Sequence, residues 1–143
     1  MYQIILIPLI VGFVAQALKV AIKLAKGQSF NRGILIGYGG MPSTHTAFSL
    51  SVLILIGLYE GIFSSIFAVA MVFTILIIRD ALGLRRYLDE HSKAINKLVY
   101  ELPNDKKNGF AIQIEKIGHT LPEVLGGAIL GIILTLLLYW FLL

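Results

Sequence analysis

Two short polar stretches carry the side chains in this sequence that are best suited to chemistry. Residues 39–45 read Gly-Gly-Met-Pro-Ser-Thr-His, residues 118–123 read Gly-His-Thr-Leu-Pro-Glu, and each stretch immediately precedes a long apolar run. Ionisable groups at the edge of a membrane span are usually functional. The two stretches are therefore the first candidates for an active site.

The first stretch has the composition of a helix start that could bind a phosphate. Ser43 or Thr44 is a suitable N-cap, the free backbone N–H groups of a helix start bind anions, and His45 would project beside such an anion. The alternative is structural, with a hydroxyl capping the helix and His45 bonding a neighbouring carbonyl. A lone short motif leaves both open.

The second stretch can form a paired histidine and carboxylate. His119 and Glu123 are four residues apart and share one face if the chain is helical here, with Pro122 in the first turn. A carboxylate bonded to one imidazole nitrogen leaves the other nitrogen poised as a base or nucleophile. Alternatively, Glu123 only favours the positive end of a helix, and His119 is a polar interface residue.

Cationic side chains follow the first and third apolar runs. Arg79, Arg85 and Arg86 could make bidentate phosphate contacts, and Lys19 could act as a point charge. Asp80 could pair with Arg85 or Arg86, orient a histidine or bind a metal. The simpler alternative is that these are ordinary charges flanking membrane spans.

The composition indicates a membrane protein. The chain has 143 residues, of which 57% are hydrophobic, and a mean hydropathy of +0.86, so a soluble core of this size could not bury its apolar side chains. We expect a single all-α domain over residues 1–143, a polytopic bundle of about four transmembrane helices. The apolar segments that predict them are 2–18, 46–59, 62–78 and 124–143.

The distribution of charge predicts how these helices are oriented. All twelve Lys and Arg residues lie in segments 19–32 and 79–116, away from the termini and from the turn at Glu60. By the positive-inside rule, both basic segments and both polar stretches face the cytoplasm of a bacterial inner membrane, and the termini lie outside. The formal charge of +4 then reflects topology and contacts with anionic headgroups, and no nucleic-acid partner is expected.

One amphipathic helix is expected outside the hydrocarbon layer. Apolar residues recur at mostly helical spacing from Ala81 to about Leu102, which predicts a cytoplasmic helix lying along the membrane interface. His91 lies within this helix, and we interpret it as part of a solvated face.

Three segments together resemble a known family. Residues 39–45, residues 79–86 (Arg-Asp-Ala-Leu-Gly-Leu-Arg-Arg) and residues 118–127 (Gly-His-Thr-Leu-Pro-Glu-Val-Leu-Gly-Gly) resemble the divergent branch of the type 2 phosphatidic acid phosphatase family, which is related to acid phosphatases and vanadium haloperoxidases. The resemblance covers nearly the whole chain. It implies a membrane phosphatase that acts on a phosphorylated lipid and needs no cofactor or metal.

The resemblance also implies roles for single residues. His119 would be the nucleophile, Glu123 would replace the family's usual Asp as its orienting partner, and His45 would be the general acid. The family's Lys with Arg-Pro and its Ser-Arg have no counterpart here, and Asp80 is a further catalytic candidate. The phosphate would be bound by Arg79, Arg85, Arg86, Lys19, Ser43 and Thr44. The family's core has six helices, so the amphipathic helix or a homodimer would complete the site.

Two other functions are consistent with the same residues. Asp80, Glu123 and a histidine could hold Mg²⁺ or Mn²⁺ in a metal-dependent phosphotransferase or hydrolase, and a chain without cysteine offers no thiolate ligand. The chain could instead be a non-catalytic binder of lipid headgroups or an assembly partner. In that case the polar motifs would only cap helices, while Gly126, Gly127 and Gly131 would allow close helix packing.

Overall fold

The computed structural model describes residues 2–30, 34, 39–103, 106–107 and 109–142, and these residues form helices joined by loops, without a strand. The helices are α1 (Gln3–Ala25), α3 (Thr44–Glu60), α4 (Ser65–Leu82), α5 (Leu84–Glu101) and α6 (Leu121–Leu142). The four predicted apolar segments correspond to α1, α3, α4 and α6, although Tyr2 precedes α1, residues 62–64 lie in the turn before α4, and Leu143 is outside the described residues. The all-α membrane bundle expected from the sequence is confirmed.

Three helical units in the described part of the chain are long and apolar enough to cross a membrane. They are α1, α6 and the continuous unit formed by α4 and α5. Helix α3 is apolar but has only 17 residues, about 26 Å at 1.5 Å per residue. Helix α1 continues beyond its predicted end and carries Lys19 and Lys23 in its last two turns.

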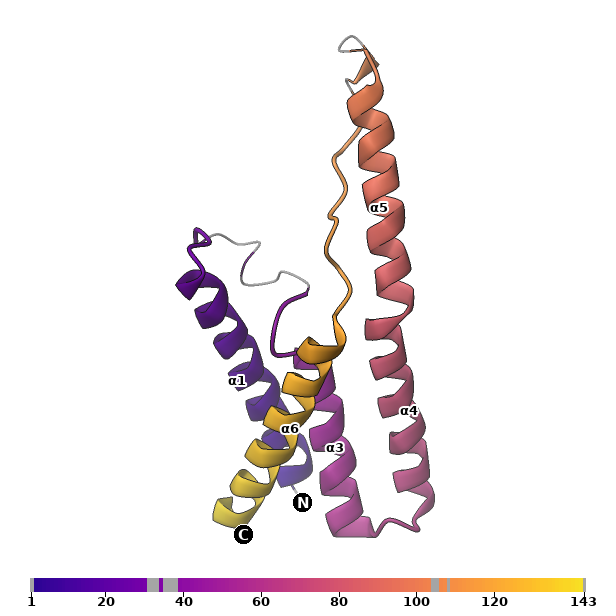
Figure 1. The fold of residues 1–143 in the computed structure, drawn as a ribbon. Helices are drawn as coiled ribbons and strands as arrows, with labels where there is room; N and C mark the ends of the chain where they lie inside the picture. The colour runs from indigo at the N-terminus through magenta and orange to yellow at the C-terminus, as the bar shows by residue number, and fades with distance from the viewer. Residues whose placement is uncertain (1, 31–33, 35–38, 104–105, 108, 143) are drawn as a thin grey trace.

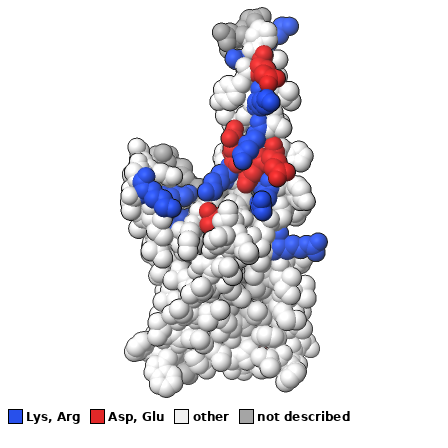
Figure 2. Space-filling model, in the orientation of Figure 1, with Lys and Arg blue, Asp and Glu red and all other residues white. Residues whose placement is uncertain are grey.

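Lys and Arg are absent from the described residues at one end of the bundle, where Glu60 ends α3, and gather at the other end. Both termini and the α3–α4 turn lie at the lower end in Figure 1, while α1 finishes and α3 and α6 begin at the other end. Figure 2 shows the Lys, Arg, Asp and Glu side chains gathered at that second end and along α5. This separation agrees with the charge partition in the sequence; which end faces the cytoplasm stays a prediction.

Helix α5 exists close to where its periodicity predicts it, but it continues from α4 and does not fold back across the end of the bundle (Figure 1). The reason is local hydrogen bonding, because the N–H of Gly83 donates to the carbonyl of Arg79 at 2.8 Å and carries the helical path through the junction. Residues 110–118 return beside α5 to the start of α6. The position of α5 relative to a membrane surface remains a prediction.

Helices α3 and α6 run parallel along a seam of small residues. A Cβ added at Gly131 would lie 2.7 Å from the carbonyl oxygen of Ala47, and one added at Gly127 would lie 3.0 Å from the nitrogen of Ser43. Small residues allow such close backbone approach, which is how membrane helices pack without a hydrophobic driving force. The seam fixes the starts of α3 and α6 side by side and so brings the two polar stretches together.

Candidate active site

His119 and Glu123 form the pair that their spacing predicts, across the start of α6. Nδ1 of His119 lies 3.1 Å from Oε2 of Glu123, and the same oxygen accepts a hydrogen bond from the N–H of Thr120 at 3.1 Å. The other carboxylate oxygen lies 3.5 Å from Nζ of Lys116. With Glu123 ionised, Nδ1–H is the donor, so Nε2 keeps a free lone pair.

The environment of His119 favours the neutral imidazole. The residue is only 2% exposed, and its backbone N–H donates to the carbonyl of Ala81 at 3.0 Å. Burial lowers the pKa of His119 below its usual value of 6.5, the positive charges of Lys19 and Arg85 act in the same direction, and the bond to Glu123 opposes them. His119 is therefore uncharged at pH 7, as a nitrogen nucleophile must be.

Ser43 is the residue that caps α3. Its Oγ accepts hydrogen bonds from the N–H of Thr46 at 3.4 Å and from the Thr46 hydroxyl at 2.9 Å. The Ser43 N–H donates to the backbone carbonyl of Glu123 at 2.9 Å, which ties the two polar stretches together. Thr44 has another partner, since its hydroxyl donates to Oε1 of Gln16 at 2.9 Å. The Ser43 amide is thus engaged within the protein.

His45 is exposed in the first turn of α3, facing a group of charged residues. It lies within electrostatic range of Arg85, Lys19, His119 and Asp80. Asp80 pairs with Arg85, which is one of the alternatives that the sequence left open. Its Oδ2 lies 2.6 Å from Nε of Arg85. The structure therefore gathers both histidines with one arginine and one lysine.

Lys19 enters this group from α1 although it is only 3% exposed. The backbone of Gly40 lies across its stem, since a Cβ there would meet Cγ of Lys19 at 3.6 Å and Cε of Lys23 at 3.1 Å. Gly40 also has a φ of +89°, a conformation that favours glycine. The glycines of the first stretch thus let the loop close over the lysines, and Lys19 lies within electrostatic range of Glu123.

The remaining two arginines are placed differently from Arg85. Arg79 is exposed on α4 and borders an apolar hollow that also includes Ile75 and Leu82. Arg86 lines a pocket of about 330 Å³ next to His119, together with Lys116 and other polar residues. The structure therefore places Arg85 near both histidines and Arg86 near His119, and it leaves Arg79 beside apolar side chains.

Asp89 on α5 is a residue of this site that sequence reasoning missed. Its carboxylate accepts hydrogen bonds from the N–H of Ile117 at 2.5 Å and of Gly118 at 3.1 Å, the two residues before His119. Seven residues further along α5, Asn96 bonds the backbone of Gln113 in both directions. Their seven-residue spacing on one helical face was the available signal, and we interpreted that face as solvated.

The two carboxylates that were considered as metal ligands, Glu123 and Asp80, contact different residues. Glu123 contacts His119 and Lys116, Asp80 contacts Arg85, and the residues that the structure describes contain no cluster of three or more potential ligands. His91 is exposed and its Nδ1 lies 2.7 Å from the carbonyl oxygen of Tyr87. This agrees with its interpretation as part of a solvated face.

Comparison with known proteins gives two matches that cover nearly the whole chain. Residues 2–134 match the family described as the Divergent PAP2 family. The chain is also 34% identical over 139 residues to the uncharacterized membrane protein YuiD of Bacillus subtilis (strain 168), an alignment that covers 89% of this chain and 87% of that protein. No solved structure matches. All three segments that carried the resemblance lie within the matched range.

Proposed function

The chain belongs to the Divergent PAP2 family, and from this premise we propose that it is a membrane-embedded phosphatase that hydrolyses a lipid phosphate or pyrophosphate. The observation that carries the proposal is the His119–Glu123 pair, in which the carboxylate engages Nδ1 and leaves Nε2 free to attack. The nearby cations, Lys19 and Arg85, suit a phosphate substrate. The apolar helices that carry the site at their ends suit a substrate that is itself a lipid.

The first half of the proposed reaction transfers the phosphoryl group to the protein. Nε2 of His119 attacks phosphorus, an N–P bond forms, and the bond from phosphorus to the leaving oxygen breaks. The negative charge of the bound phosphate favours the protonated form of His45, which then gives its proton to that oxygen. Because His119 is nearly enclosed, the groups that cover the imidazole have to move slightly when the phosphate binds.

The second half returns His119 to its starting state. Water attacks phosphorus, the N–P bond breaks, and neutral His45 takes up the proton that the water loses. Lys19 and Arg85 stabilise the equatorial oxygens throughout. Arg85 can do so while paired, since the contact with Asp80 uses only Nε and a guanidinium has four further N–H donors.

The proposal also includes the location and the composition of the site. We place it at the cytoplasmic face of a bacterial inner membrane, because the basic side chains lie at the end of the bundle that holds the histidines. The contacts of Asp89 with the loop before His119 favour α5 over a second copy of the chain as the element that completes the site.

The test is phosphate release by the purified protein in detergent. Phosphatidate, phosphatidylglycerophosphate and isoprenyl phosphates are offered with and without chelator, to the wild type and to His119→Ala, His45→Ala and the matched control His91→Ala. We expect chelator-resistant release that falls at least 10³-fold in His119→Ala and about 10²–10⁴-fold in His45→Ala, with His91→Ala unchanged.

Each other outcome contradicts the proposal in a distinct way. Full release by His119→Ala would refute the phosphohistidine route. Release that stops with chelator would favour the metal-dependent hydrolase. Binding of a phosphate analogue without turnover of any of these lipids would favour the headgroup-binding module.

A further inference from the structure

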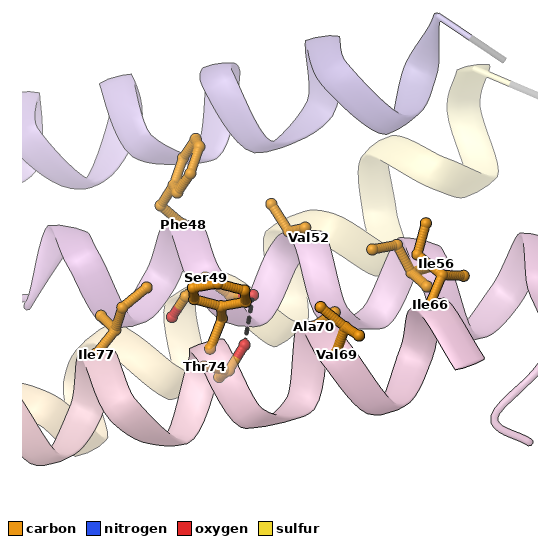
Figure 3. Close-up of a pocket in the computed structure, with 10 residues that line it drawn as sticks. Phe48, Ser49, Val52, Ile56, Ile66, Val69, Ala70, Thr74 and Ile77 are labelled. Carbon is orange, nitrogen blue, oxygen red and sulfur yellow. Dashed lines mark hydrogen bonds between the residues drawn. The ribbon is translucent and has the colours of Figure 1, made fainter. Parts of the chain in front are cut away.

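An apolar groove of about 350 Å³ lies between α3 and α4. Figure 3 shows its two walls, which are bridged by a hydrogen bond from the Thr74 hydroxyl to the backbone carbonyl of Ser49 at 3.3 Å. The principal side chains of the walls are Ser49, Val52 and Ile56 on α3, and Val69, Ala70 and Ile77 on α4. The volume is within the range of small-molecule sites, roughly 300–1,000 Å³.

The α3 wall of the groove leads to His45. Residues 45, 49, 52 and 56 follow the spacing of a single helical face, so His45 lies one turn beyond Ser49 on the face of α3 that forms this wall. From Ser49 to Ile56 the wall is about 11 Å long, at 1.5 Å per residue.

The α4 wall leads to the same place. Residues 69, 73, 77 and 80 share one face of α4, and at position 80 the apolar wall gives way to Asp80 and its partner Arg85. His45 lies within electrostatic range of both. The groove is therefore apolar along its length and ends in a histidine and a paired arginine.

We propose that this groove holds the hydrocarbon tail of the phosphorylated lipid while the phosphate lies at His45 and His119. The tail assignment rests on the proposed function for the identity of the headgroup. One amphiphile matches both parts of the site, because an anionic headgroup suits the cations and a hydrocarbon chain suits the walls. A neutral lipid would match only the walls.

The main effect of the groove is to fix the position of the bound substrate. Bilayer lipid is as apolar as the groove, so moving a tail between them brings little hydrophobic free energy. What the groove provides is a fixed distance between the tail and the reacting phosphorus, which is the kind of orientation that accelerates reactions. Its effect should therefore appear in kcat/KM for long-chain substrates.

The first experiment narrows the groove. Ala70→Trp fills it from α4, and Val52→Phe fills it from α3; Val72→Trp, at a 53% exposed position of α4, is the matched control. We expect both groove variants to lower kcat/KM at least tenfold for a long-chain lipid phosphate and less than twofold for a soluble short-chain analogue, and the control to change neither. Equal loss for both chain lengths would overturn the proposal.

The second experiment does not need turnover. A non-hydrolysable phosphonate lipid with a diazirine in its tail is photolysed with the full chain in vesicles, and labelled peptides are mapped. We expect labelling in 49–56 and 66–77 that an unlabelled lipid phosphate displaces and a neutral lipid of the same tails does not. Equal displacement by both would overturn the groove. Specific labelling in a protein without phosphatase activity would support the groove and refute the proposed function.

Discussion

Replacing Gly131 with alanine should separate α3 from α6 and disable the site that their starts form. The added Cβ would lie 2.7 Å from the carbonyl oxygen of Ala47 and 2.8 Å from its Cα. Normal contact is about 3.5 Å, so the backbones would have to part by about 0.8 Å. His45 lies on the same turn of α3 as Ala47.

The expected loss of stability in Gly131→Ala follows from a comparison with Gly126→Ala on the same helix. There the added Cβ meets Cε of Met41 at 2.6 Å, the end of a flexible side chain that can move. Both substitutions gain about 1 kcal/mol of helix propensity, so the difference between the variants isolates packing. We expect Gly131→Ala to be about 1–3 kcal/mol less stable than Gly126→Ala.

The assay is unfolding in mixed micelles by increasing SDS, followed by circular dichroism, with phosphate release measured in parallel. A displacement of this size next to His45, the proposed general acid, should lower phosphate release by Gly131→Ala roughly 10–100-fold, while Gly126→Ala keeps the wild-type rate. Equal unfolding midpoints and equal activities for the two variants would refute the argument that the backbone seam positions the site.

Three further predictions concern charge and hydrogen bonding. Since burial lowers the pKa of His119 below 6.5, protonation should remove the nucleophile only below that value; a kcat/KM profile whose acid limb lies above pH 6.5 would contradict this. Asp89→Ala should lower activity about 10–100-fold through loss of charge-assisted bonds of about 1.5–3 kcal/mol, and speed amide exchange at residues 117 and 118; unchanged exchange relative to the control Glu90→Ala would oppose it. Arg85→Ala should lower kcat about 10²–10³-fold and Arg79→Ala less than twofold. Similar losses in the two variants would contradict the inference that Arg79 lies away from the phosphate.

The features that the sequence predicted well are those that depend on neighbours along the chain. The spacing of His119 and Glu123 is one helical turn, so the pair needed only a helix start at Pro122 to form. The sequence limited the N-cap of α3 to Ser43 or Thr44, and the structure shows that it is Ser43. The apolar segments followed from hydropathy and the residue range of α5 followed from periodicity, and both patterns describe one helix at a time.

The features that were missed depend on contacts between distant segments. Asp89 accepts hydrogen bonds from amides that lie 28 and 29 positions later, and its spacing from Asn96 marks a polar face of α5 without identifying the segment that this face contacts. Which of Arg79 and Arg85 faces the histidines depends on the side of its helix on which each residue lies. The orientation of α5 relative to α4 at Gly83 determines this for Arg85. The α3–α4 groove and the register of Gly131 against Ala47 likewise arise only when helices pack.

The short length of α3 would make the bilayer part of the proposed reaction. Its 17 residues span about 26 Å, against a hydrocarbon layer of about 30 Å, and this mismatch costs fractions of a kcal/mol per Å. Helix α3 packs against α1, α4 and α6 and is open at the groove with α4, so lipids at this groove can meet the mismatch by thinning, which would lower their phosphates toward His45. A thick, ordered membrane resists thinning and holds the phosphates above the histidines. Membrane thickness would thus control access to the site without any change of protein conformation.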